Sequence, residues 1–152
     1  MSDLRVHKTK YINETKRVSF KYDGKNYFGY EGDTLASALL ANGVHLIGRS
    51  FKYHRPRGIM SCGSEEPNAI CQISDKNDLT EPNVRATELE IYDGLEAFSQ
   101  NCWPNVKFDI GGINNLISPL IPAGFYYKTF MWPKSFWKKV YEPLIRMSAG
   151  LG

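Results

Sequence analysis

Hydrophobic and polar residues alternate just after a polar lead of residues 1–14, which we expect to be flexible. Val18, Phe20 and Tyr22 fall on one face of a strand, because successive side chains of a strand point to opposite faces. Asp23-Gly24 follows and favours a tight two-residue turn, and Tyr27 lies in the alternating segment beyond it. The pattern predicts a β-hairpin.

Helical spacing replaces the alternation in "GDTLASALLANGV", residues 32–44. Leu35 and Leu39 share one face of a helix, and Asp33 or Thr34 offers a side-chain oxygen to cap its first turn. Asn42-Gly43 ends the pattern with two residues that tolerate the left-handed conformation. We expect one short amphipathic helix here.

Residues 44–47 have the composition of a strand or an extended segment, and residues 68–74 and 84–94 have the composition of strands. A long loop with the sequence "GRSFKYHRPRGIMSCGSEEPNA" separates the first two. Two strands, a helix, a strand and a long glycine-containing loop follow the layout of plant-type ferredoxins. We therefore predict an α+β fold, a ferredoxin-like β-grasp domain over residues 15–94.

Residues 95–152 differ from the preceding segment in composition and pattern, because they contain all three tryptophans and many large apolar residues without a regular period. "KSFWKKVYEPLIRM" near the end favours a short helix. An apolar and irregular segment does not readily form a core of its own. We expect an extended, aromatic-rich arm that lies against another domain or subunit.

The net charge of +3 is concentrated in one place. The loop of residues 48–58 holds four basic residues and no acid, so the rest of the chain sums to −1. Its aromatic residues make nucleic-acid binding an alternative, but the chain as a whole is only slightly basic and contains no nucleic-acid motif. We interpret the loop as a docking surface for carboxylate or cofactor-phosphate groups, with five candidate residues: Arg49, Lys52, His54, Arg55 and Arg57.

No apolar run is long enough to span a bilayer, and the first residues lack the apolar block of a signal peptide. The three cysteines are odd in number and do not resemble a disulfide framework. We expect a cytoplasmic protein that does not bind a membrane.

Iron–sulfur chemistry is tested by ligand spacing. Plant-type ferredoxins place three thiolates as C-x4-C-x2-C and add a fourth. A register that begins at Cys62 meets Pro67 and Ile70, and one that ends at Cys71 fails in the same way. The sequence contains no CxxC or HxxxH pair and therefore does not support a zinc site. It also contains no nucleophile motif. We expect neither a metal site nor catalytic residues in this chain.

Several blocks resemble the N-terminal region of the alpha subunit of heterotetrameric sarcosine oxidase. They include "GDTLASALLANGV", "GRSFKYHRPRGI", "GSEEPNA", "EPNVRAT" and "AGFYYKTFMWP". The resemblance implies a ferredoxin-like domain that has lost its iron–sulfur cluster. It also implies a fragment of a longer subunit, because the chain stops at "SAGLG", where a glycine-rich dinucleotide-binding domain is expected to begin.

The resemblance also implies the partners and cofactors of the full complex. They are the rest of the alpha subunit, the beta, gamma and delta subunits, NAD, FAD, FMN and tetrahydrofolate. That complex would oxidise sarcosine to glycine and hydrogen peroxide and pass the one-carbon unit to tetrahydrofolate.

We expect this chain to be a non-catalytic scaffold without a cofactor of its own, inactive in isolation. Two alternatives stay open: a 2Fe-2S electron-transfer domain of a related amine dehydrogenase, and a standalone nucleic-acid or protein-binding module. Iron content and a salt-dependent gel shift separate them. The preferred amine substrate also stays open.

Overall fold

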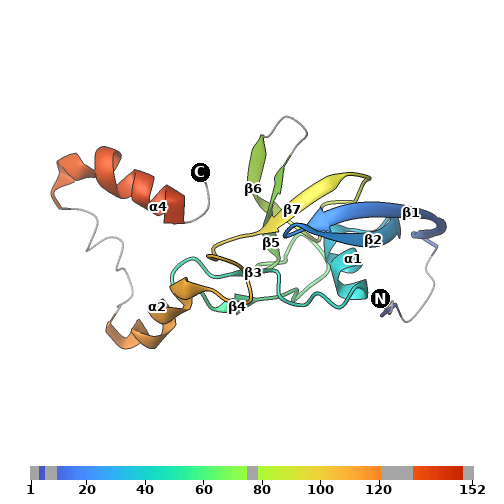
Figure 1. Ribbon diagram of the computed structural model, residues 1–152, viewed down its shortest axis with the longest axis horizontal. Helices are drawn as coiled ribbons and strands as arrows, with labels where there is room; N and C mark the ends of the chain where they lie inside the picture. The colour runs from blue at the N-terminus through green and yellow to red at the C-terminus, as the bar shows by residue number, and fades with distance from the viewer. Residues whose placement is uncertain (1–3, 6–9, 75–78, 121–131, 149–152) are drawn as a thin grey trace.

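The computed structural model describes residues 4–5, 10–74, 79–120 and 132–148. Five strands form one mixed sheet in the order β2-β1-β7-β5-β6, and a separate ribbon pairs β3 with β4 (Figure 1). β1 is antiparallel to β2 and parallel to β7, while β5 is antiparallel to both β7 and β6. The predicted α+β class is confirmed, and the arrangement is consistent with a ferredoxin-like domain.

The predicted hairpin is confirmed as β1 (Asn13–Tyr22) and β2 (Lys25–Glu31). Asp23 and Gly24 between them have φ values of 48° and 72°. Positive φ at both central residues defines the turn whose twist matches the flanking strands. The inward face of β1 buries Phe20 and Tyr22.

The predicted helix is α1, Leu35–Ala41, which packs against β2 and contributes to the core. Thr34 is its N-cap, with a side-chain oxygen that accepts a hydrogen bond from the Ser37 backbone N–H at 3.2 Å. Asn42 caps the other end, and Gly43 follows with a φ of 74°. The capping residues therefore act as the sequence indicates.

The segment before α1 is anchored by a buried carboxylate. Asp33 is fully buried and accepts a 2.9 Å hydrogen bond from Arg5 Nη1, while Arg5 Nη2 contacts its other oxygen. Leu4 donates its backbone N–H to the carbonyl of Ala41 at 2.9 Å. Leu4 and Arg5, within the lead that was expected to be flexible, are thus held on the domain, because a buried carboxylate requires a partner.

The later strands differ from the sequence expectations. The ribbon consists of β3 (Gly48–Arg49) and β4 (Pro56–Arg57), so no strand forms at residues 44–47. β5 (Ile70–Ser74) is confirmed, and β6 is Thr80–Arg85. The expected strand over residues 84–94 is wrong: beyond Arg85 the chain bonds to the start of α1, where the backbone N–H of Leu35 donates to the carbonyl of Leu89 at 2.7 Å. Its apolar pattern reflects the burial of Ala86 and Ile91 in the core cluster to which α1 also contributes.

The centre of the sheet is β7, Leu95–Ser99, which lies between β1 and β5. Leu95 and Ala97 are fully buried. The sheet therefore extends past residue 94, where the arm was expected to begin.

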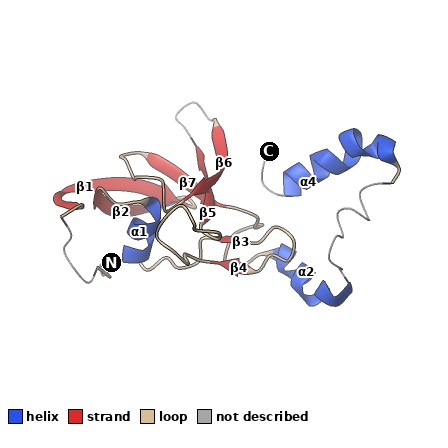
Figure 2. Cartoon of the chain, turned by 180° about the vertical axis from the view of Figure 1, so that it is seen from behind, coloured by secondary structure: helices blue, strands red, loops and turns tan. Residues whose placement is uncertain are grey.

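Among the described residues beyond Ser99, residues 100–109 contain no helix, whereas residues 110–120 and 134–148 form short helical turns (Figure 2). An extended arm that lies against another domain or subunit stays a prediction. "KSFWKKVYEPLIRM" is helical, as expected, and most of "AGFYYKTFMWP" lies outside the described residues. The elements are η1 (Ile110–Gly112), α2 (Ile113–Leu116), η2 (Ser118–Leu120), η3 (Lys134–Phe136), the π-helical η4 (Trp137–Tyr141) and α4 (Glu142–Ser148). Among the described residues, no helix has the length and apolarity needed to cross a membrane.

Candidate functional site

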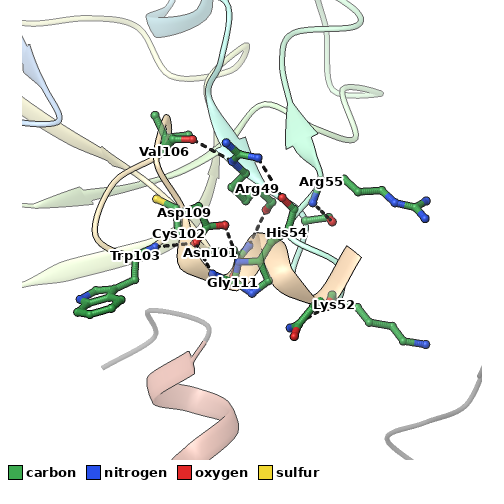
Figure 3. Close-up of polar contacts among 12 residues, drawn as sticks. Arg49, Lys52, His54, Arg55, Asn101, Cys102, Trp103, Val106, Asp109 and Gly111 are labelled. Atoms are coloured by element: carbon green, nitrogen blue, oxygen red, sulfur yellow. Dashed lines mark hydrogen bonds and ion pairs between the residues drawn. The ribbon is translucent and has the colours of Figure 1, made fainter. Parts of the chain in front are cut away.

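The basic loop, residues 48–58, reaches across to the segment that follows β7 (Figure 3). Arg49 donates from Nε to the carbonyl of Val106 at 2.9 Å and from Nη2 to the carbonyl of Lys107 at 3.3 Å. Its Nη1 donates to the carbonyl of His54 at 3.2 Å. The guanidinium thus joins the middle of its own loop, at His54, to the segment beyond the sheet.

His54 makes the second connection. Its Nδ1 lies 2.7 Å from Asp109 Oδ2, and the Asp109 side chain is fully buried. Asp109 Oδ1 accepts hydrogen bonds from the backbone N–H groups of Trp103 at 3.0 Å and Gly111 at 3.1 Å. A Cβ at Gly111 would lie 2.2 Å from the His54 ring, so only glycine permits this approach.

The other candidates are placed nearer the surface. Arg55 Nε donates to Asn115 Oδ1 at 3.0 Å, and the Arg55 guanidinium lies 4.8 Å from the centre of the Tyr53 ring. Lys52 Nζ lies 4.8 Å from the same ring, while the Lys52 carbonyl accepts a 3.4 Å hydrogen bond from an asparagine in α2. Tyr53 is thus flanked by two cations.

Arg57 is the exception among the five candidates, because it bonds to another loop. Its Nη1 donates to Asn68 Oδ1 at 2.9 Å. The structure therefore brings Arg49, Lys52, His54 and Arg55 onto the segment of residues 106–115. Arg55 and Arg57 remain exposed, and a docking role for them stays a prediction.

Asp109 is the residue of this site that sequence reasoning missed. It precedes Ile110-Gly111-Gly112 and caps η1 through the Gly111 N–H. An aspartate before a glycine-rich turn is a signal for such a cap. That signal does not reveal the distant partner, since His54 is separated from Asp109 by 55 positions.

A second polar cluster forms the loop between β4 and β5. Glu66 is 1% exposed, and each carboxylate oxygen accepts backbone N–H bonds. Oε2 accepts from Met60 at 2.7 Å and Ser61 at 2.5 Å, and Oε1 accepts from Asn68 at 2.7 Å and Ala69 at 3.1 Å. Burial raises the pKa of this carboxyl, but the four N–H donors outweigh that effect and lower its pKa to about 2.

The three cysteines occupy unlike environments. Cys71 is buried in β5, where burial and then the Asp23 charge raise the pKa of its thiol to about 12. Burial also raises the pKa of the half-buried Cys102, and Cys62 is exposed. A [2Fe-2S] cluster needs four thiolate-type ligands, and no group of three metal-ligating side chains occurs in the described part of the chain. The residues present do not fit such a cluster.

The sequence of residues 15–102 places the chain in a known domain family. Residues 15–102 match the family described as "2Fe-2S iron-sulfur cluster binding domain", and the chain belongs to it. The match includes β7, in agreement with the sheet.

Over its whole length the chain is homologous to an oxidase subunit. It is 57% identical over 152 residues to the sarcosine oxidase subunit alpha of Rhizobium meliloti (strain 1021), a match that covers 100% of this chain and 15% of that protein. The subunits alpha of Corynebacterium sp. strains U-96 and P-1 are 41% and 43% identical over 88 residues, covering 57% of this chain and 9% of each relative. The resemblance to this oxidoreductase subunit is confirmed, and the chain spans about 15% or less of these relatives.

One solved structure is also similar, the L-proline dehydrogenase from P. horikoshii. The TM-score is 0.46 at 24% identity, and the match covers 59% of this chain and 16% of that one.

Proposed function

We propose that this chain is a non-catalytic docking domain of a sarcosine oxidase alpha subunit. The observation that carries the proposal is the 57% identity to such a subunit along the entire chain. The lack of fit between the cysteines and a cluster supports a scaffold role over electron transfer.

Exposed apolar side chains supply the docking surface. Large apolar side chains of residues 103–120 and of the last helical region are exposed, although folded domains bury most such groups. They are Trp103, Phe108, Ile110, Ile113, Leu116, Leu120, Phe136, Trp137, Leu144 and Met147.

The last helical region, η3 to α4, is amphipathic. Trp137, Val140, Leu144 and Met147 recur at intervals of three or four residues, the spacing of one helix face, and Phe136 lies four residues before Val140. The opposite face carries the basic residues of the region, Lys134, Lys138, Lys139 and Arg146. Such a helix fits an apolar groove with an acidic rim on the rest of the subunit or on a partner subunit.

The proposed parent complex contains beta, gamma and delta subunits with NAD, FAD, FMN and tetrahydrofolate. It oxidises sarcosine to glycine and hydrogen peroxide, with transfer of the one-carbon unit to tetrahydrofolate. This chain docks onto other parts of the complex and so promotes its assembly, and it holds none of these cofactors. Arg55 and Arg57, the exposed cations of the basic loop, provide a second contact to carboxylate or phosphate groups.

The test uses the complete alpha subunit co-expressed with its partners. Trp137→Ala combined with Leu144→Ala removes two apolar anchors, and Lys139→Ala on the polar face is the matched control. Because each buried interface anchor contributes more than about 1 kcal/mol, the double variant should lower the yield of assembled complex by roughly tenfold or more. Sarcosine-dependent peroxide formation per assembled complex should stay at the wild-type value.

Two outcomes contradict the proposal. Normal assembly of the double variant would show that this face is not a docking surface. Iron bound to this domain in the purified complex, with visible absorbance bleached by sarcosine, would instead establish electron transfer.

A further inference from the structure

The loop between β4 and β5 contains the ligand spacing of a [2Fe-2S] domain at positions that hold no cysteine. Plant-type ferredoxins use C-x4-C-x2-C. Positions 61, 66 and 69 have the same spacing and hold Ser61, Glu66 and Ala69. A search for cysteines overlooks this register, because Cys62 lies one position away from it.

The structure brings these three positions together. The Glu66 carboxylate accepts the backbone N–H of Ser61 at 2.5 Å and that of Ala69 at 3.1 Å. The hydroxyl of Ser61 lies 3.3 Å from the same carboxylate. The backbone N–H groups of Ser61 and Ala69 therefore both point toward the Glu66 carboxylate.

A fourth residue reaches the loop from outside it. Thr87 follows β6, is buried, and donates its hydroxyl to the carbonyl of Gly63 at 2.8 Å. A plant-type cluster likewise takes its last ligand from beyond the loop. Thr87 has the location that such a ligand requires.

The charge at the centre of the loop has the same sign as a cluster. A [2Fe-2S] centre with four thiolates is anionic, and its sulfurs accept hydrogen bonds from the protein. Glu66 supplies one buried negative charge that four backbone N–H groups meet. Backbone N–H groups that point into a loop stabilise a negative charge at its centre, whether a cluster or a carboxylate carries that charge.

We propose that residues 58–69 correspond to the cluster-binding loop of a [2Fe-2S] domain and that the Glu66 carboxylate takes the place of the cluster. Ser61, Glu66 and Ala69 occupy three former ligand positions, and Thr87 occupies the fourth. The register that begins at Cys62, used in the sequence analysis, is one residue out of place. This inference concerns the loop alone and is independent of the proposed docking role.

The first test removes the charge while keeping the shape. Glu66→Gln turns an NH2 group toward two backbone donors, whereas Glu65→Gln makes the same change on an exposed neighbour. The pair of amides that faces the NH2 group, Met60 and Ser61 or Asn68 and Ala69, loses its acceptor and should exchange about tenfold or more faster. The control should leave these rates unchanged, and equal rates in wild type and Glu66→Gln would overturn the proposal.

The second test restores the ligands. Ser61→Cys, Glu66→Cys, Ala69→Cys and Thr87→Cys are combined in the 152-residue chain, which is then incubated anaerobically with ferric iron and sulfide. The variant should bind about two irons per chain and absorb in the visible.

The matched control keeps native Cys62 and carries Pro67→Cys, Ile70→Cys and Thr87→Cys, so it offers four thiols in the displaced register. It should hold no cluster. A folded first variant that binds no iron, or a control that binds it equally well, would overturn the assigned positions. The exchange measurement decides the role of Glu66 even if the cysteine variants do not fold.

Discussion

Asp109→Ala is the sharpest test of how the basic loop holds the segment beyond the sheet. The substitution removes a buried carboxylate that accepts from Trp103 and Gly111 and pairs with His54. Alanine keeps the Cβ atom and removes only the carboxylate, so the change acts on these three contacts. We expect the segment of residues 101–116 to detach locally while the sheet stays folded.

The magnitude follows from the contacts. Two backbone N–H groups and one imidazole N lose their partner. The exposed Trp103 N–H can bond to water instead, whereas the part-buried donors of Gly111 and His54 are left without a partner, which costs about 1–3 kcal/mol for each fully buried donor. Contacts to one carboxylate are coupled, so their costs do not add fully. About 3 kcal/mol of local stability should be lost, which corresponds to a roughly hundredfold increase in the population of the open segment.

Native-state hydrogen exchange measures this population residue by residue. The Trp103 and Gly111 amides should exchange roughly a hundredfold faster in Asp109→Ala, whereas the Leu95 amide in β7 should not change. Asp93→Ala is the control, because Asp93 also accepts a backbone N–H, from Ser19 at 2.7 Å, but lies exposed. If Trp103 and Gly111 exchange alike in both variants, Asp109 does not hold the segment.

Two further predictions concern the loops around the ribbon. Because its pKa falls from 4.5 to about 2 on folding, Glu66 should stabilise the protein above about pH 4.5, and this stability should be lost as the pH falls toward 2. Thermal midpoints measured between these pH values should therefore fall more steeply in wild type than in Glu66→Gln, and parallel curves would contradict the interpretation. Gly58→Ala should destabilise by about 1–3 kcal/mol, since its Cβ would lie 2.6 Å from the backbone oxygen of His45. Gly112→Ala, whose Cβ meets nothing within 4 Å, is the control in the same denaturation assay.

Local signals explain which elements the sequence predicted well. The hairpin and α1 follow from short-range features: alternation, Asp23-Gly24, the Thr34 cap and Asn42-Gly43. Each feature acts within a few residues and needs no knowledge of the rest of the fold. These elements were therefore predictable with their boundaries nearly correct.

Long-range pairing explains the errors. β7 is a five-residue strand whose partners are β1 and β5, and it is surrounded by a segment that looks irregular. The alternation over residues 84–94 reports the burial of Ala86 and Ile91 in the core and is indistinguishable by period from a strand. Period alone does not identify the neighbour against which a face is buried.

For the same reason, only part of the candidate site could be predicted from the sequence. A cluster of basic residues is visible in the sequence, but their carbonyl and carboxylate partners, at Val106, Lys107 and Asp109, are carried by a distant segment. The register of Ser61, Glu66 and Ala69 was missed because the search required a cysteine. Only the hydrogen bonds around Glu66 identify it.

The contacts of the basic loop also decide how its arginines should be interpreted in an assembly. Arg49 makes three hydrogen bonds to backbone carbonyls, so a substitution there would change the shape of the loop before it changed any outside contact. His54 is likewise committed to Asp109. Arg55 and Arg57 are exposed, and each makes a side-chain hydrogen bond to an asparagine, which a stronger carboxylate or phosphate partner could displace. A loss of assembly caused by Arg49→Ala would therefore report on folding, whereas the same loss in Arg55→Ala or Arg57→Ala would report on docking.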